Sequence, residues 1–540
     1  MARQMFVSVG DIRARRSYSC STADSIHMKR SCSQFLRSDS FAYDPRVDIP
    51  DSSGQMSFNL APKYNPELTA SYTRPDSGSD KGKSSQSWRR KATGPRFLRH
   101  TFCGASKGPK IAGLPLDNHH KGKNMTVSIR RLGGVGLLAM TLLCSSLAAN
   151  AGETIELTPM EVLGKELFFD KISSPDWMSC AECHNPDFGW TGPIPGVNKH
   201  GAVYRGAVPT RFGNRKPPSA AYATFSPVFY YDEDEDLFIG GNFWDGRATG
   251  ERLGNPAADQ ALGPFLNPVE QNNPSKEAVC LQVAASNYAG LFEEVWGPGS
   301  LDCVTNTEAM YDQIGLSIAA YEGSGEVNQF SSKYDAFLAG ETVLSDEEAQ
   351  GLALFEGQAM CSACHPTGTG SLFTDFTYDN LGAPRNPENP FYDMGTELLG
   401  DGTPINPLGS SWVDPGLGGF LQTRLEWQVK SSANMGKHKV PTLRNVGKGS
   451  SKAYGHNGYF KSLKGVVHFY NTRDTKPECP DPFTTEKDAL QMNCWPIPEV
   501  PANENITELG SLGLTEADED AIVAFMLTLS DEFKVKKKTK

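Results

Sequence analysis

Two short stretches, Cys180-Ala181-Glu182-Cys183-His184 and Cys361-Ser362-Ala363-Cys364-His365, repeat one pattern, Cys-x-x-Cys-His. This pattern is the attachment signature of c-type haem: the two thiols add to the porphyrin vinyl groups, and the adjacent histidine binds the iron. A four-cysteine zinc site also uses Cys-x-x-Cys pairs, but it would leave both histidines without a role. The sequence therefore predicts two covalently bound haem c groups, held by Cys180, Cys183, His184, Cys361, Cys364 and His365.

Amphipathic stretches surround both motifs. Residues 163–169 precede the first motif and residues 345–355 the second, and both are predicted to be helices that lead into the haem turn. Residues 515–529 predict another helix with one apolar face, and residues 314–321 are expected to close the first half in the same way. Strand patterns are scarce. We therefore predict a mainly α fold with two tandem cytochrome c-like helical haem domains, residues 152–344 and 345–540, joined by long irregular loops.

The beginning of the chain differs in composition from the rest. Residues 1–124 carry 21 Lys and Arg against 10 Asp and Glu, and they show no sustained apolar period. Such a segment cannot bury enough apolar surface to offset its ordering entropy, so it is predicted to be disordered or to be an extension from a misassigned start codon. A basic arm for nucleic acid or lipid is the alternative. No aromatic or periodic pattern supports it, and no nucleic-acid partner is expected.

Residues 125–151 have the three parts of a secretory signal peptide. Arg130-Arg131 is followed by an apolar run over residues 132–147 and by Ala149-Asn150-Ala151 before Gly152. The run is shorter than the roughly 20 residues that span a bilayer, although an uncleaved anchor is the alternative. No later segment is apolar enough to span. The sequence predicts a periplasmic protein that is not embedded in the membrane.

Four further cysteines agree with export. Cys280 with Cys303, and Cys479 with Cys494, form two local pairs. Disulfides persist outside the cytosol, so both pairs are candidate bridges, with free buried thiols as the alternative.

Longer blocks around these motifs resemble a known family. They are LGKELFFD (163–170) with SCAECHNPDFGWTG (179–192), NFWDGRA (242–248) with GPFLNPVE (263–270), and KVPTLRN (439–445) with YGHNGYFKSLKGVVHFYN (454–471). In this order they are similar to the bacterial di-haem cytochrome c peroxidase and MauG family. The resemblance covers most of residues 155–530.

The resemblance implies roles for individual residues. The haem on His184 would react with peroxide, and the haem on His365 would receive electrons. Trp244 would lie between the haems as an electron bridge; on sequence alone it is a buried core aromatic. Glu270 would be the distal acid–base residue at the first haem, where splitting an O–O bond requires moving a proton. A lone glutamate is otherwise most often a solvated surface charge.

Two further iron ligands are implied by the same resemblance. His200 would cap the first haem in the fully oxidised state; an exposed loop histidine is the alternative. Tyr470 stands where the peroxidases have methionine and where MauG has tyrosine, so it is expected to be the distal ligand of the second haem. Met435 is the fallback ligand, and a packed helix aromatic is the alternative role for Tyr470.

The resemblance leaves the calcium ion of this family open. That ion is held partly by an Asn before a Pro, and the matching stretch here, Asn214-Arg215-Lys216-Pro217, has Lys216 at that place.

Three functions remain on this basis. The first is a periplasmic peroxidase that takes electrons from a small c-type cytochrome or a cupredoxin and reduces hydrogen peroxide, with a homodimer left open. The second is a MauG-like oxidase acting on a protein or organic substrate. The third is an electron-transfer cytochrome without catalysis. Residues 152–540 carry 29 Lys and Arg against 53 Asp and Glu, which favours a basic electron donor.

Overall fold

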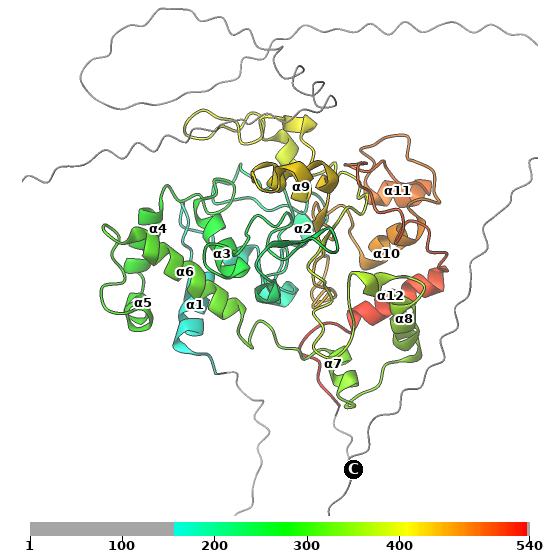
Figure 1. The fold of residues 1–540 in the computed structure, drawn as a ribbon, viewed down its shortest axis with the longest axis horizontal. Coiled ribbons are helices and arrows are strands. Elements are labelled where there is room, and N and C mark those ends of the chain that lie inside the picture. The colour runs from blue at the N-terminus through cyan, green and yellow to red at the C-terminus, as the bar shows by residue number, and fades with distance from the viewer. Residues whose placement is uncertain (1–155, 537–540) are drawn as a thin grey trace, which may run out of the picture. The chain divides into compact units, whose positions relative to one another are not determined.

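A computed structural model describes residues 156–536 of the chain (Figure 1). The predictions for residues 1–124 and for the signal peptide at 125–151 lie outside this range. The described part is mainly helical, as predicted. Its helices are α1 (Pro159–Phe169), α2 (Pro195–Asn198), α3 (Pro256–Leu266), α4 (Lys276–Ala284), α5 (Ala289–Trp296), α6 (Thr307–Glu322), α7 (Lys333–Leu338), α8 (Asp346–Glu356), α9 (Gly416–Gln422), α10 (Leu463–Thr472), α11 (Glu486–Met492) and α12 (Glu516–Leu527).

The described strands are very short. β1 (Tyr230–Asp232) pairs antiparallel with β2 (Leu237–Ile239), and β3 (Tyr378–Asp379) pairs antiparallel with β4 (His438–Lys439). The second pair joins the segment after the second motif to the KVPTLRN block. None of the helices within residues 156–536 combines the length and the apolar character needed to cross a bilayer.

The helices beside the two motifs begin in the same way. Thr158 caps α1 with a capping box closed by Glu161, and Ser345 caps α8 with one closed by Glu348. In each box the hydroxyl accepts a backbone N–H three residues later while the carboxylate accepts the N–H of the cap residue, which satisfies donors that the helix itself leaves free.

Two helix pairs repeat one packing arrangement. α1 packs against α6, and α8 packs against α12 (Figure 1). At the first crossing a Cβ on Gly164 would lie 1.9 Å from the carbonyl oxygen of Ser317, and at the second a Cβ on Gly351 would lie 1.9 Å from that of Ala521. Only glycine permits so close an approach of the two backbones.

One helical turn beyond each glycine, aromatic side chains of the two helices pack against each other. The rings of Phe168 and Tyr321 meet edge-on with centroids 5.7 Å apart, and those of Phe355 and Phe525 with centroids 5.2 Å apart. The four aromatic residues are among the most deeply buried side chains of their two apolar cores. The helix expected over residues 314–321 is the second half of α6, and the helix expected over 515–529 is α12.

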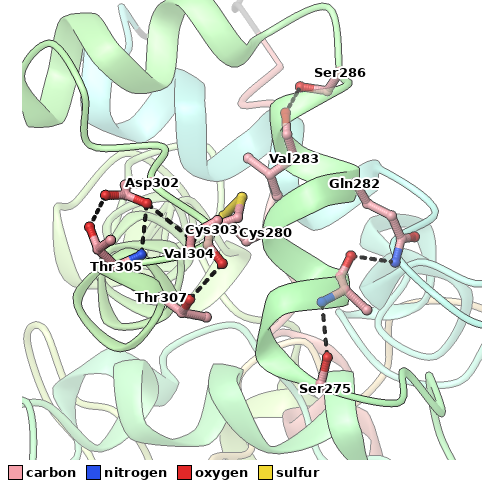
Figure 2. Close-up of a disulfide and its surroundings, with 11 residues drawn as sticks. Ser275, Cys280, Gln282, Val283, Ser286, Asp302, Cys303, Val304, Thr305 and Thr307 are labelled. Carbon is pink, nitrogen blue, oxygen red and sulfur yellow. Dashed lines mark hydrogen bonds between the residues drawn. A yellow bond between two sulfur atoms is a disulfide. The ribbon is translucent and has the colours of Figure 1, made fainter.

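The expected disulfides are both present, Cys280–Cys303 and Cys479–Cys494. Figure 2 shows the first, which ties α4 to the loop that precedes α6. Within that loop Asp302 accepts the backbone N–H groups of Val304 and Thr305, and Thr307 donates its hydroxyl to the carbonyl of Cys303. The bridge therefore holds a folded turn against the first core.

Candidate active site

Both Cys-x-x-Cys-His motifs fold as a single tight turn. The first includes a 3₁₀ turn over Cys180–Glu182 and the second over Cys361–Ala363. In each, the histidine N–H donates to the carbonyl of the first cysteine over 2.9 Å. The four motif cysteines are the ones within residues 156–536 that form no disulfide. Each turn thus presents two thiols and an imidazole on one short loop.

The two motif histidines are oriented alike. The carbonyl oxygen of Trp190 lies 3.2 Å from Nδ1 of His184, and that of Phe373 lies 2.7 Å from Nδ1 of His365. A carbonyl partner at Nδ1 fixes the tautomer that leaves Nε2 available to a metal. Burial lowers the pKa of His184 to about 4 and also lowers that of His365, so both are neutral, which is the form that binds metal. These donors fit the haem groups that the motifs predict.

One cavity of about 320 Å³ is bordered by both motifs. His184 lines it from the first half of the described chain and His365 from the second. Trp244 and Tyr470 line the same cavity. The structure therefore brings together four of the residues singled out in the sequence, from segments far apart along the chain.

Trp244 is held firmly. Its side chain is buried, and its indole N–H donates to the carbonyl of Lys216 over 2.8 Å. Its own carbonyl accepts the N–H of Lys439 over 2.8 Å. The Trp244 ring also meets that of His456 edge-on, with centroids 6.4 Å apart. Its position in the cavity wall is thus set by residues on both sides.

Glu270 lies beside the first motif rather than in the cavity lining. Asn267 donates its side-chain amide to Oε1 of Glu270 over 2.7 Å. Burial, followed by the charge of Glu270, raises the pKa of Cys183. Burial raises the pKa of Glu270 itself, against the opposing charge of Arg247. A carboxyl group with a raised pKa near the motif is suited to proton transfer.

Tyr470 lies near the second motif, on α10. Burial, followed by the charges of Asp379, Cys361 and Cys364, raises its pKa. The fallback residue Met435 packs elsewhere: its sulfur lies 3.9 Å from the hydroxyl of Ser431, and it is not part of the cavity wall.

The structure does not bring His200 to the first motif. Its side chain is 61% exposed, and its Nδ1 lies 2.7 Å from a carboxylate oxygen of Glu388. It follows the short helix α2 on the surface, and it is not part of the cavity lining. The arrangement matches the exposed loop histidine that was the alternative.

In the stretch that matches the family's calcium site, residues 214–217, the side chain of Lys216 makes two hydrogen bonds. Its ammonium donates to the hydroxyl of Thr191 over 2.7 Å and to the carbonyl of Pro217 over 3.1 Å. The carbonyl of Asn214 accepts the side-chain amide of Asn389. A second cation beside Lys216 would be repelled by its charge.

Several further residues line the cavity. Gln260 and Glu322 line the cavity from α3 and α6. Glu322 is 4% exposed, and burial raises its pKa to about 8. The rings of His438 and His456 stack with centroids 3.5 Å apart, and Nε2 of His438 lies 3.4 Å from Asp414, which also pairs with Arg215. His456 belongs to the YGHNG block that carries the family resemblance, whereas nothing local marks the others, because their burial depends on chain segments that are distant in sequence.

Comparison with known proteins agrees with this arrangement. The family model of the di-haem cytochrome c peroxidase matches residues 159–343. The methylamine utilization protein MauG of Paracoccus denitrificans (strain Pd 1222) is 33% identical over 386 residues, which are 69% of this chain and 88% of that protein. The cytochrome-c peroxidase IdrP2 of Pseudomonas sp. (strain SCT) is 26% identical over 420 residues, 74% of this chain and 92% of that protein.

A solved structure has a similar fold. The diheme peroxidase BthA from Burkholderia thailandensis E264 superposes with a TM-score of 0.54 at 30% identity, covering 70% of this chain and 88% of that one. A tyrosine-to-methionine variant of BthA gives a TM-score of 0.56 at 29% identity, with the same coverage. With its two haem-attachment motifs bordering one cavity, the chain belongs to the di-haem cytochrome c peroxidase and MauG family of oxidoreductases, which implies two haem c groups.

Proposed function

We propose that this chain is a periplasmic peroxidase that reduces hydrogen peroxide to two molecules of water, using two electrons and two protons. The observation that carries the proposal is the shared cavity, bordered by His184, Trp244 and His365. Reduction of peroxide needs two electrons, which two redox centres can supply together. An aromatic ring in the wall of their shared cavity gives the electrons a route between them. Each bound haem supplies an iron that accepts and gives up single electrons.

We assign iron binding, proton transfer and electron transfer to different side chains. His184 and His365 would hold the two irons through Nε2. Glu270 would take a proton from peroxide and return it to the departing oxygen, a task suited to a partly buried carboxyl group with a raised pKa. Trp244 carries electrons from the second site to the first. Tyr470 would bind the second iron. His200, exposed and paired with Glu388, leaves the first site open to peroxide in this arrangement.

The electrons come from a small c-type cytochrome or a cupredoxin. Residues 152–540 are strongly acidic, which steers a basic donor toward the chain. Export by the segment at 125–151 puts the chain in the compartment of such donors. N-terminal sequencing of the exported protein tests this, with Gly152 as the expected first residue.

A MauG-like oxidase is the second candidate. The presence of Tyr470, rather than a thioether, beside the second motif favours it. A phenolate ligand favours ferric iron and lowers the reduction potential, which changes how electrons are shared between the two haems.

One experiment separates the two candidates. A reduced small cytochrome c is mixed with the exported holoprotein, and its oxidation is followed when hydrogen peroxide is added. Oxidation that continues over many turnovers and depends on peroxide supports the peroxidase. If the donor is not oxidised while peroxide still produces a long-lived change in the haem absorption spectrum, the oxidase takes its place. If neither is seen, both proposals fail.

A further inference from the structure

Three lysine side chains form part of the cavity lining. Lys216, Lys439 and Lys452 all line it, and Lys216 and Lys452 are only 7% and 8% exposed. Lys439 donates to the hydroxyl of Ser226 over 2.6 Å and to the carbonyl of Gly241 over 2.7 Å. Lys452 donates to the carbonyl of Asn445 over 2.9 Å.

These ammonium groups have only neutral partners. Within residues 156–536, the hydrogen bonds of Lys216, Lys439 and Lys452 go to hydroxyl and carbonyl oxygens, and none of the three forms a salt bridge. Arg215, a buried cation of the same region, is paired: it lies 2.5 Å from Asp245 and 2.6 Å from Asp414. The three cavity lysines therefore differ from Arg215 in having no carboxylate within salt-bridge distance.

Burying an ammonium group without a counter-charge is costly. Burial lowers the pKa of Lys216 to about 8 and those of Lys439 and Lys452 to about 7, in Lys439 against the charge of Asp375. Lys216 and Lys452 also repel each other. A cavity that gathers three such groups is suited to an anionic ligand.

The haem groups themselves would bring that negative charge. Each haem carries two propionate carboxylates, so two haems in this cavity would bring four. We propose that Lys216, Lys439 and Lys452 form ion pairs with the haem propionates. The inference rests on the proposed haem attachment at both motifs, and it does not depend on whether the chain turns over peroxide.

The neighbours of each lysine indicate with which haem it forms its ion pair. Lys216 donates to Thr191, and a Cβ on Gly189 would lie 3.1 Å from Nζ of Lys452. Both neighbours belong to the loop that follows His184, so Lys216 and Lys452 serve the first haem. Nζ of Lys439 lies 4.8 Å from the ring centroid of Phe376, in the segment that follows His365, so Lys439 serves the second haem.

Reduction potentials test this assignment. Lys452→Met and Lys439→Met remove the charges with little change in length, and each haem of the purified holoprotein is titrated potentiometrically. A nearby positive charge stabilises the reduced haem, so its removal lowers the ratio of reduced to oxidised haem at a fixed potential by about tenfold or more. Lys452→Met is expected to affect the first haem and Lys439→Met the second. Lys199→Gln, an exposed lysine of the first half, is the control and leaves both ratios within about twofold.

Further measurements cover the remaining outcomes. If a methionine variant does not retain both haems, Lys452→Arg and Lys439→Arg keep the charge, and redox difference infrared spectra with ¹³C-labelled propionates report the carboxylates directly. A propionate band that shifts in the arginine variants supports the ion pairs. Unchanged potentials in both methionine variants, or unshifted bands in both arginine variants, overturn them. Wild-type potentials that change when acetate is added would assign the lysines to a free carboxylate instead, and would also overturn the proposal.

Discussion

The indole N–H of Trp244 donates to the backbone carbonyl of Lys216 over 2.8 Å, inside a cavity that both haem-attachment motifs border. The same lysine carries one of the unpaired cavity charges. The proposed electron bridge and a proposed propionate partner are therefore tied together through one backbone group.

Trp244→Phe is expected to slow peroxide-dependent donor oxidation by about tenfold or more, because the wider indole ring is lost from the cavity wall. The unpaired carbonyl of Lys216 should also cost about 1 kcal/mol of unfolding free energy. Stopped-flow absorbance of the two haems measures transfer between them. Trp412→Phe makes the same change outside the cavity lining and serves as the control. Equal transfer rates in both variants would remove Trp244 from the electron path.

Glu270→Gln is expected to reduce peroxide turnover by about 10²–10⁴-fold while both haem spectra stay unchanged. Turnover is measured against a reduced cytochrome c. Because burial raises the pKa of Glu270 and the ionised carboxylate is the form that accepts a proton, wild-type turnover should rise with pH through that raised pKa. Glu277→Gln, an exposed residue of α4, is the control. Retained turnover in Glu270→Gln would exclude this residue from the mechanism.

Tyr470→Met is expected to raise the reduction potential of the second haem, since a thioether ligand favours ferrous iron more than a phenolate does. Potentiometric titration measures it. Tyr470→Phe removes the hydroxyl without supplying a sulfur, and it should change the ferric absorption spectrum without the same rise. An identical potential in wild type and Tyr470→Met would show that Tyr470 is not a ligand.

Gly351→Ala should destabilise the chain by about 2 kcal/mol or more, because the new Cβ would meet the carbonyl of Ala521 at 1.9 Å. Denaturant unfolding of the holoprotein measures the loss. In Gly290→Ala, on α5, the new Cβ would meet nothing within 4 Å, so stability should stay constant or rise by up to about 1 kcal/mol. Equal stabilities of the two variants would contradict the close crossing of α8 and α12.

Glu486→Gln should make stability less dependent on pH. Burial raises the pKa of Glu486 from 4.5 to about 7, against a hydrogen bond from the N–H of Lys461. The stability due to the protonated form is therefore present below pH 4.5 and is lost as the pH rises to about 7. At pH 8 the variant should be more stable than wild type by on the order of 3 kcal/mol. Denaturant unfolding at pH 5 and pH 8 tests this, and a difference that does not grow with pH would contradict it.

The sequence by itself determined the local features. Haem attachment needs two cysteines and a histidine within five consecutive residues, so both sites could be read directly. The helices α8 and α12 were predictable because caps and apolar spacing are local signals. The resemblance also pointed to Trp244 and Tyr470, which the structure brings to the cavity. His200 shows the limit: the family resemblance suggested a ligand, whereas in the structure its side chain is 61% exposed and contacts Glu388 on the surface.

Only the tertiary structure decided what surrounds the haem sites. The burial of Glu322, the stacking of His438 on His456 and the gathering of Lys216, Lys439 and Lys452 have no local signal. A charge is buried or paired according to which distant segments fold against it, as when the N–H of Lys439 reaches the carbonyl of Trp244. Desolvation and charge pairing are properties of that packed neighbourhood, so they are defined only once both halves of the described chain enclose the cavity.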